Sequence, residues 1–444
     1  MLLTIEKLVY GGDGLARLPP PQPEEDRGRG KAVFVPFVLA GEKVEAALTE
    51  QKSGFARAAA QAIIEASPHR VAAVCPYFGR CGGCHYQHAD YEHQLAIKAE
   101  ILRENLRRIA RLELSCAIKV HPSPPWNYRN RARLQVRARP EFAAGYFELA
   151  SHRLLPVEEC PISSPLINRG IAALWLMGRA GKATEEVHEV EFFANAEDTQ
   201  LLVELSCPPE ARRAAVRAWA EQLRAALPEI VGIAAFRESK PGAMEPLITL
   251  GAAELTYRTH AASYRVGAGS FFQTNRHLVD ELVSIVSDGQ SGDLAFDLYA
   301  GVGLFSTALA CNFRHIVSVE SSQTAFSDLQ YNRPSNGEAT LAATERYLHQ
   351  PDVTGRARNG AVLPQVPPPD LAVVDPPRAG LGERVARALA GLGAARVIYV
   401  SCDPATLARD MVPLLAAGYR VHGADLVDMF PQTYHLESVL HLER

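Results

Sequence analysis

Short runs of alternating apolar and polar residues dominate the first 66 residues. They read LTIEKLVY, KAVFVPFV, EKVEAAL and FARAAAQAII, and they are separated by the turn GGDG and by a polar, proline-rich insert from Pro19 to Gly30. Such alternation predicts half-buried strands, and short strands joined by glycine-rich turns are typical of a small β-barrel. We therefore expect a barrel of the oligonucleotide-binding type over residues 1–66, which either binds RNA or serves as a scaffold.

The middle of the chain mixes two periodicities. Residues 90–111 have apolar side chains at helical spacing, which predicts an amphipathic helix. Further on, strands are predicted at RNRARLQVRAR, AAGYFEL, EVEFFAN, TQLLVELS and VGIAAFRE, with helices over 166–177 and 209–227. This mixture predicts an α+β domain, and we place it over residues 67–265.

From about residue 266, strands and helices alternate regularly. Strands are predicted at LAFDLYAG, HIVSVE, LAVVDPPR, VIYVSCDP and VLHLER, and helices around Leu282, Ala310, Phe326, Val385 and Leu407. This alternation predicts a doubly wound α/β sheet of the Rossmann-like kind over residues 266–444. Only residues 334–369, rich in glycine, proline and polar residues, show no clear periodicity.

Composition and charge narrow the class of protein. The chain is 47% hydrophobic and 22% charged, and no stretch approaches the roughly 20 apolar residues that span a bilayer, so we expect a cytoplasmic protein without membrane contact. The net charge is −4, yet residues 98–139 hold eleven basic and three acidic residues. The arginines at 129, 131, 133, 137 and 139 alternate with smaller residues, which predicts a strand with one cationic face. Either a nucleic-acid backbone or nearby acidic side chains would neutralise that face.

Four of the eight cysteines form a pattern typical of metal ligands. Cys75, Cys81 and Cys84 lie within ten residues, and Cys160 precedes a proline far downstream. Zinc and iron–sulfur clusters both accept four thiolates, and three close cysteines plus a remote Cys-Pro favour a 4Fe–4S cluster over zinc. The remaining cysteines apart from Cys402 are interpreted as core thiols: Cys116, Cys207 and Cys311.

Two strand ends have the features of a cofactor site. The sequence DLYAGVGLFS follows a strand and opens a helix, with Gly301 and Gly303 in the turn and Glu320 at the end of the next strand. A dinucleotide site prefers a third glycine where this chain has Ser306, so S-adenosylmethionine is favoured over a dinucleotide. Asp375 precedes two prolines, which make a rigid turn without backbone donors; a purely structural turn is the alternative.

Cys402 ends a further strand, in VIYVSCDPA. Buried packing is the ordinary role of such a thiol, but a nucleophile at this place fits methylation of a pyrimidine at carbon 5. A thiolate added to carbon 6 activates carbon 5 toward a methyl donor, and a base must then remove the carbon 5 proton. Glu437, in HLESV, is a carboxylate near the C-terminus, although spacing alone does not single it out among fifty acidic residues.

The motifs CPYFGRCGGC, SFFQTN, DLYAGVGLFS, VVDPPRAGL, YVSCDPATLARD and HLESV together resemble the RNA 5-methyluridine methyltransferases of the bacterial 23S ribosomal-RNA uracil type. The resemblance covers nearly the whole chain. It implies a TRAM barrel, a central iron–sulfur domain and a Rossmann-like methyltransferase domain. It also implies a monomeric enzyme that takes S-adenosylmethionine and RNA, with ribosomal RNA favoured over transfer RNA.

The resemblance further implies residue roles. Cys402 is the expected nucleophile and Glu437 the expected proton acceptor. The residues expected to contact S-adenosylmethionine or the uracil are Gln273, Tyr299, Gly301, Glu320 and Asp375, and those expected to hold the cluster are Cys75, Cys81, Cys84 and Cys160. The chain departs from the family where Val302 stands between the two glycines, and the adenine contact, with Asp352 as one candidate, stays open.

Two other classes compete with this hypothesis. The first alternative is an RNA-binding module that keeps a degenerate methyltransferase fold as a scaffold, in which Cys402, Glu437 and Asp375 have no catalytic role. A radical S-adenosylmethionine enzyme is the second alternative, but such enzymes usually have Cys-x₃-Cys-x₂-Cys, whereas five residues separate Cys75 from Cys81 here. The fourth cysteine also leaves no iron open, so we expect a structural or RNA-positioning cluster.

Overall fold

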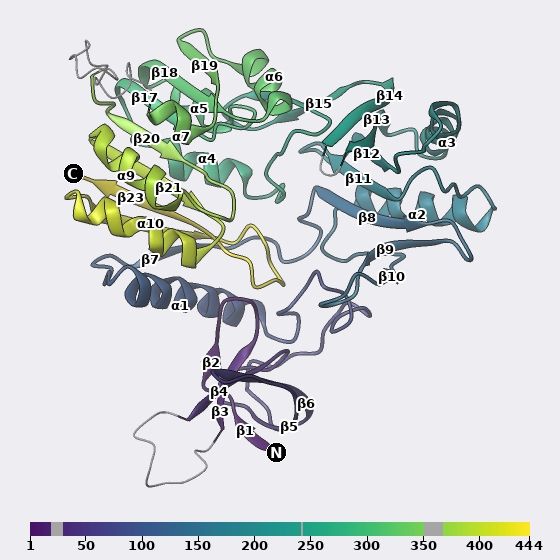
Figure 1. The fold of residues 1–444 in the computed structure, drawn as a ribbon, viewed down its shortest axis with the longest axis horizontal. Helices are drawn as coiled ribbons and strands as arrows, with labels where there is room; N and C mark the ends of the chain where they lie inside the picture. The colour runs from purple at the N-terminus through teal and green to yellow at the C-terminus, as the bar shows by residue number, and fades with distance from the viewer. Residues whose placement is uncertain (19–29, 241–242, 350–366) are drawn as a thin grey trace.

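The computed structural model describes residues 1–18, 30–240, 243–349 and 367–444, and its chain forms three large sheets (Figure 1). A small N-terminal sheet lies below helix α1 (Tyr91–Ile109) in the figure, a seven-stranded sheet lies to the right, and an eight-stranded sheet lies to the left. Among the described residues, no helix is both long and apolar enough to cross a membrane.

The N-terminal sheet curls around its own apolar core, and we call it the N-terminal barrel. Its strands, in the order β1-β5-β6-β4-β3-β2, are β1 (Leu2–Thr4), β2 (Lys7–Leu8), β3 (Gly14–Leu18), β4 (Lys31–Val35), β5 (Lys43–Gln51) and β6 (Phe55–Glu65). Alternate residues are buried in β4 (Val33 and Val35) and in the first half of β5 (Val44 and Ala46), as the sequence alternation predicts. The predicted insert from Pro19 lies, up to residue 29, outside the described residues.

The seven-stranded sheet has the order β10-β9-β8-β11-β12-β13-β14 and is covered by two helices. Its elements are β8 (Arg131–Arg137), β9 (Ala143–Phe147), β10 (Leu154–Pro156), α2 (Pro165–Arg179), β11 (Glu189–Ala194), β12 (Leu201–Cys207), α3 (Arg213–Ala226), β13 (Ile230–Lys240) and β14 (Ala243–Gly251). A separate hairpin, β15 (Glu254–Arg258) and β16 (Ser263–Gly267), leads on to the next sheet.

The predicted arginine strand is β8, and its alternation is confirmed, because Ala132, Leu134 and Val136 are buried. Its charge is partly neutralised within the protein. Glu191 of the neighbouring strand accepts from Arg131 at 2.5 Å and from Arg133 at 2.7 Å. For these two arginines, therefore, nearby acidic side chains already supply the negative charge.

The eight-stranded sheet has the order β19-β18-β17-β20-β21-β23-β22-β7. Its strands are β7 (Ile118–His121), β17 (Gly292–Leu298), β18 (Phe313–Glu320), β19 (Gly337–Leu341), β20 (Leu371–Val374), β21 (Arg396–Ser401), β22 (Arg420–Val427) and β23 (Glu437–Glu443). Strands β19 to β21 are parallel, whereas β23 runs antiparallel between β21 and β22. The strand order reverses between β17 and β20, the place where open α/β sheets bind ligands.

Helices cover both faces of this sheet, and its inner strands β20 and β21 are accordingly almost continuously apolar. The helices are α4 (Val279–Ser287), α5 (Leu304–Leu309), α6 (Gln323–Asn332), α7 (Thr344–Leu348), α9 (Gly382–Leu392) and α10 (Pro404–Ala416). Helix α1 and strand β7 come from the range that we assign to the central domain, yet α1 packs on α10 and β7 pairs with β22.

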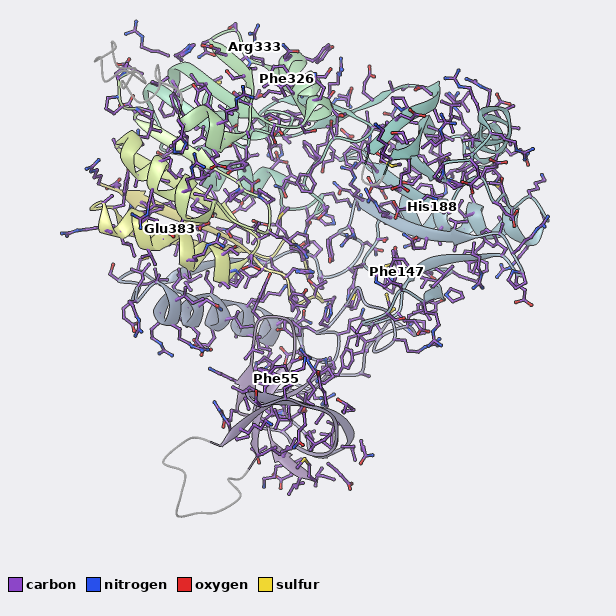
Figure 2. The ribbon with its side chains drawn as sticks, viewed as in Figure 1. Phe55, Phe147, His188, Phe326, Arg333 and Glu383 are labelled. Carbon is purple, nitrogen blue, oxygen red and sulfur yellow. The ribbon has the colours of Figure 1, made fainter. Side chains whose placement is uncertain are left out.

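The N-terminal barrel packs directly against the rest of the protein. Its residues Leu8 and Leu39 share one apolar cluster with Ile97 of α1 and with Leu426 and Leu436 of the eight-stranded sheet and its loop. Side chains accordingly fill the region between the barrel, marked by Phe55, and the rest of the chain (Figure 2). The N-terminal barrel is thus packed against the segments that follow β22.

Candidate active site

Three predicted site residues lie close together at the end of the eight-stranded sheet where strands β20 and β21 finish and strand β23 begins. Asp375 follows β20, Cys402 follows β21, and Glu437 begins β23. Strands β21 and β23 are antiparallel with Ser401 opposite Ser438, so Cys402 and Glu437 occupy the next facing positions. Side chains at facing positions of an antiparallel pair lie side by side, which brings together residues far apart in the sequence.

The surroundings of Cys402 keep its thiol protonated in the free protein. Burial raises the pKa of Cys402 to about 12, and the nearby carboxyl groups of Glu437 and Asp375 add to the rise. The Arg378 guanidinium opposes them. A thiol of this kind becomes a nucleophile only when its proton is removed, so its reactivity depends on what fills the site.

Glu437 is a buried carboxyl group without an evident structural partner. Its side chain is buried, and its Oε1 has no hydrogen-bond partner among the described residues. Burial raises the pKa of Glu437 well above its ordinary value, and the neighbouring Asp375 raises it further. The carboxyl group therefore holds its proton more tightly than an ordinary glutamate does, and it can accept a proton only in its ionised form.

A second group of acids lies where the strand order reverses. Asp297, the last but one residue of β17, is fully buried, and its Oδ2 accepts from the Ser306 backbone N at 2.9 Å. Its Oδ1 has no partner among the described residues. Burial raises the pKa of Asp297 to about 6 and that of Asp375 to about 7, and the charge of Asp297 contributes to the shift at Asp375. The two carboxyl groups therefore share one small region.

The predicted glycine turn connects β17 to α5. Gly301 and Gly303 have φ angles of 56° and 95°, which side-chain-bearing residues rarely adopt. A Cβ atom on Gly301 would meet nothing within 4 Å, so the turn is open on that side. The Gly301 backbone N donates to Glu320 Oε2 at 2.9 Å, and Tyr299, also at positive φ, packs against the core beside the turn.

Gln273 reaches the same edge from the SFFQTN segment. It is buried, and its Nε2 lies 3.5 Å from Asp375 Oδ2. The Asn130 side chain, just before β8, donates to the Gln273 carbonyl at 3.1 Å. The five predicted contact residues Gln273, Tyr299, Gly301, Glu320 and Asp375 thus line the reversal point. Asp352 lies outside the described residues.

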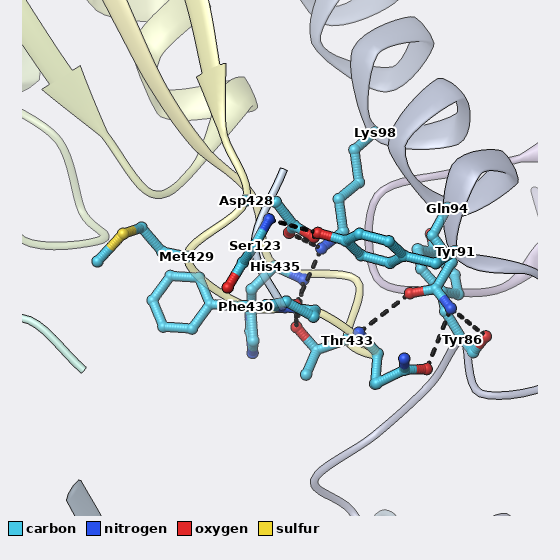
Figure 3. Close-up of polar contacts among 12 residues, drawn as sticks. Tyr86, Tyr91, Gln94, Lys98, Ser123, Asp428, Met429, Phe430, Thr433 and His435 are labelled. Carbon is cyan, nitrogen blue, oxygen red and sulfur yellow. Dashed lines mark hydrogen bonds and ion pairs between the residues drawn. The ribbon is translucent and has the colours of Figure 1, made fainter. Parts of the chain in front are cut away.

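The loop from Asp428 to Leu436, which leads to Glu437, is held by helix α1 (Figure 3). Lys98 and Asp428 form a fully buried ion pair at 2.6 Å, and Lys98 Nζ also donates to the Phe430 carbonyl at 2.9 Å. Tyr91 donates to Asp428 at 2.9 Å. These contacts fix the approach of the chain to β23.

The four predicted ligand cysteines line one cavity of about 320 Å³. Burial raises the pKa of Cys81 to about 11 and that of Cys84 to about 12, and the charge of Cys160 contributes in both cases. The thiols are thus neighbours that oppose each other's ionisation. Within the described ranges, however, no group of three or more His, Cys, Asp or Glu side chains has the arrangement of a site for a metal ion.

Not all three of the cysteines that were predicted to be core thiols are buried. Cys207 is fully buried in the core of the seven-stranded sheet, and Cys116 is partly buried beside the core of the eight-stranded sheet. Cys311 is exposed, so its assignment as a core thiol is wrong. It lies in the turn after α5, where the chain leaves the core before β18 begins.

Sequence reasoning missed Asp297, Arg378 and His435 as site residues. Arg378 Nη2 lies 3.3 Å from His435 Nε2, and burial, aided by the Arg378 charge, lowers the pKa of His435 to about 3. His435 is therefore a neutral imidazole next to Arg378, two residues before Glu437. The signal for Asp297 and Arg378 was present, because each lies in a motif that was singled out, DLYAGVG and DPPRAG.

Comparisons with known proteins agree with this arrangement. The family model described as tRNA (Uracil-5-)-methyltransferase matches residues 90–444, and the TRAM domain matches residues 1–60. An uncharacterized RNA methyltransferase of Aquifex aeolicus is 32% identical over 99% of this chain and 98% of its own length. The 23S rRNA (uracil(1939)-C(5))-methyltransferase RlmD of Pseudomonas putida is 31% identical, over 98% of this chain and 92% of its own.

A solved structure shows the same fold. The tRNA (uracil-54, C5)-methyltransferase of Pyrococcus abyssi, in complex with S-adenosyl-L-homocysteine, superimposes with a TM-score of 0.73 at 24% identity and covers 100% of both chains. The overall arrangement, a methyltransferase fold with an N-terminal TRAM domain, is therefore confirmed.

Proposed function

The chain belongs to the tRNA (uracil-5-)-methyltransferase family, and from this premise we propose that it methylates carbon 5 of a uridine in 23S ribosomal RNA through a covalent adduct on Cys402. One observation carries the proposal: Cys402, Glu437 and Asp375 converge at the ends of the adjacent strands β20, β21 and β23. A scaffold without catalysis has no need of a buried carboxyl group opposite a thiol, with one oxygen that lacks a hydrogen-bond partner in the described part of the chain.

Cys402 acts first in the proposed reaction. Its thiolate bonds to carbon 6 of the uracil, the carbon 5–carbon 6 double bond opens, and carbon 5 becomes nucleophilic. When bound, S-adenosylmethionine would supply the methyl group that carbon 5 takes up, its sulfur–methyl bond would break, and S-adenosylhomocysteine would leave. Glu437 then accepts the proton from carbon 5, the double bond forms again, and the Cys402 thiolate leaves. The position of Glu437 opposite Cys402 in the paired strands β21 and β23 supports its role as the proton acceptor.

The residues at the reversal point fit the methyl donor. The unpartnered Asp297 Oδ1 and the partly exposed Glu320 provide acceptors for its amino and hydroxyl groups. Gly301 leaves open space for the donor to approach the backbone. Three carboxyl groups, those of Asp297, Glu320 and Asp375, also give the site a negative potential that favours a cationic sulfonium.

We infer that the cysteine cavity holds a 4Fe–4S cluster. The four cysteines line one cavity of about 320 Å³, and four thiolates around one centre are the ligand set that such a cluster takes. A cationic cluster would stabilise thiolates that otherwise oppose one another's charge. Cys84 directly precedes His85 and Tyr86, whose backbone N atoms both donate to the Gln432 carbonyl at 2.9 Å, which supports a structural role beside the active site.

Ribosomal RNA is the preferred substrate class because the relatives whose substrate is given in their names, at 31% identity, act on 23S rRNA. Transfer RNA is the second candidate, since the family model is named for it. Mapping methylated uridines in a strain that lacks this protein, and again after complementation, decides between the two. Loss of a transfer RNA site with an intact ribosomal RNA would reverse our preference.

The mechanism itself is tested with two substitutions. Cys402→Ala should abolish methyl transfer to a substrate RNA, because no other described thiol lies at this edge of the sheet. Glu437→Gln should methylate carbon 5 but retain the RNA, seen as a band of low mobility that survives denaturation. Full turnover by Cys402→Ala, or turnover by Glu437→Gln without any trapped RNA, would contradict the assigned roles.

A further inference from the structure

The N-terminal barrel touches the backbone of the proposed nucleophile. Tyr10 lies in the turn between β2 and β3, and its hydroxyl donates to the Cys402 carbonyl at 3.1 Å, across 392 residues of sequence. Burial and then the Asp403 charge raise the pKa of Tyr10 above its ordinary value, so the hydroxyl keeps its proton and remains a donor. The barrel therefore contributes a hydrogen bond to the loop that presents the thiol.

A second contact joins the Tyr10 ring to the 428–436 loop. The rings of Tyr10 and Tyr434 meet edge to face with centroids 5.4 Å apart, and His85 meets the Tyr434 ring at 4.6 Å. Such edge-to-face pairs stabilise a defined ring orientation. Tyr434 directly precedes His435, so the same tyrosine of the barrel contacts both chain segments that carry the proposed chemistry.

Apolar packing extends this interface. Leu8 and Leu39 of the barrel are buried in one cluster with Leu436, the residue immediately before Glu437. Side chains buried in a packed cluster have few alternative positions, so they restrict the backbone that carries them. The barrel thus constrains the residue before the proposed base as well as the carbonyl of the proposed nucleophile.

We propose that the N-terminal barrel is a positioning element for the reaction, and that Tyr10 orients the Cys402 loop through its hydrogen bond to the Cys402 carbonyl. This inference rests on the proposed role of Cys402. It assigns the barrel a task beyond holding RNA, because the contact joins two parts of the protein and needs no substrate.

The local structure of the loop explains why one hydrogen bond matters. The next residue, Asp403, is fixed, because its carboxylate caps helix α10 by accepting from the Ala405 and Thr406 backbone N atoms at 3.0 and 2.9 Å. The preceding Ser401 is fixed by β21. Cys402 stands between them. The Asp403 backbone N of the next peptide donates to Ser401 Oγ at 3.2 Å, and the Tyr10 hydroxyl donates to the Cys402 carbonyl of the same peptide, so that both sides of this peptide are held.

Tyr10→Phe tests the proposal with minimal disturbance, since it removes one hydroxyl and keeps the ring against Tyr434. We expect kcat for RNA methylation to fall about threefold to tenfold, the range that one neutral hydrogen bond supplies, with the Kd for RNA unchanged within about twofold. Alkylation of Cys402 by iodoacetamide without RNA should become at least about threefold faster, because a loosened loop exposes the buried thiol.

Tyr419→Phe is the matched control. Its hydroxyl also donates to a backbone carbonyl, that of Ala394 at 2.7 Å, but away from Cys402. It should change neither kcat per folded protein nor the alkylation of Cys402. The proposal is overturned if Tyr10→Phe leaves kcat and alkylation unchanged, or if it weakens RNA binding while kcat stays the same.

The proposed reaction and the proposed role of the barrel are tested by different variants. If Cys402→Ala remains active, the proposed function is wrong, whatever Tyr10→Phe does. If Cys402→Ala is inactive while Tyr10→Phe behaves like the wild type in turnover and alkylation, only the positioning role of the barrel is wrong.

Discussion

Replacing Lys98 by methionine removes the positive charge from the buried pair that anchors the 428–436 loop. Both side chains of the pair are fully inaccessible, and Lys98 Nζ bonds to Asp428 at 2.6 Å and to the Phe430 carbonyl at 2.9 Å. Methionine is also long and unbranched, so the substitution leaves little empty volume. The main consequence is an uncompensated carboxylate in the interior of the protein.

The loss of stability can be worked out, because a buried carboxylate without a positive partner is relieved by taking up a proton. Protonating a carboxyl group whose pKa in water is about 3.9 costs about 4 kcal/mol at pH 7 but only about 1.5 kcal/mol at pH 5, at about 1.36 kcal/mol per pH unit. Breaking a buried pair by removing one partner typically costs about 3–5 kcal/mol, in agreement with the first figure. We therefore expect Lys98→Met to destabilise the loop at neutral pH and much less in mild acid.

Amide hydrogen exchange of residues 428–436 is the suitable assay, because a chain with three sheets does not unfold in one step and exchange reports local opening. After correction for the intrinsic pH dependence, exchange in Lys98→Met should exceed the wild type about a thousandfold at pH 7 and about tenfold at pH 5. The loosened loop should also misplace Glu437, so that RNA remains trapped on Cys402 for longer.

Two control variants isolate the charge. Lys98→Met combined with Asp428→Asn removes both charges and should recover most of the lost protection and abolish its pH dependence. Lys119→Met, at an exposed position of β7, should exchange like the wild type. An equal increase at both pH values, or a double variant less protected than the single one, would refute the reasoning.

Two further predictions concern the thiols. Cys81→Ser should lower the iron and sulfide content of protein purified without oxygen, while Cys207→Ser, a buried cysteine elsewhere, should not; zinc in place of iron would overturn the cluster assignment. The rate of Cys402 alkylation in the free protein should climb about tenfold per unit from about pH 7 to about pH 9, because burial and the Glu437 and Asp375 carboxyl groups hold its pKa near 12; a plateau within that interval would contradict this environment.

The fold was largely predictable where local periodicity decides the structure. The predicted helix over 90–111 is α1, and its N-terminus at Asp90 follows from capping, since that carboxylate accepts from the His93 backbone N at 2.8 Å. Strands β17, β18, β20 and β21 are apolar runs covered on both faces and were recognised as such. Strand β22 was missed, because polar residues such as His422 interrupt its apolar pattern.

The pairing of β7 with β22 was not predictable from the sequence. Residues 118–121 read IKVH, a short run with no periodicity of its own, and only the tertiary fold gives them an edge to pair with. The ion pair of the buried Lys98 was equally hidden. Its spacing of three and four residues from Ile101 and Leu102 places it on the buried face of α1, but the sequence does not reveal its partner Asp428, which lies 330 residues away.

The candidate site likewise combines residues that the sequence identified with residues that only the tertiary fold brings in. Motif spacing identified Cys402, Asp375 and the glycine turn, because each follows an apolar run that ends at one edge of the sheet. Glu437 was one acid among many until the register of β21 and β23 set it opposite Cys402. The orphaned Asp297 Oδ1 and the neutral His435 are properties of burial, which no local pattern reveals.

The positions of the proposed nucleophile and base depend on the N-terminal part of the chain. Tyr10 holds the Cys402 carbonyl, Lys98 holds Asp428, and Gln94 exchanges hydrogen bonds with Gln432 at 3.0 Å in both directions. Residues 266–444 contain the predicted catalytic and cofactor-contact residues but lack β7, α1 and the barrel, so the polar groups of the 428–436 loop would lose these partners. The motifs identify the groups that we propose to react, and the N-terminal segments supply contacts to the chain segments that carry those groups.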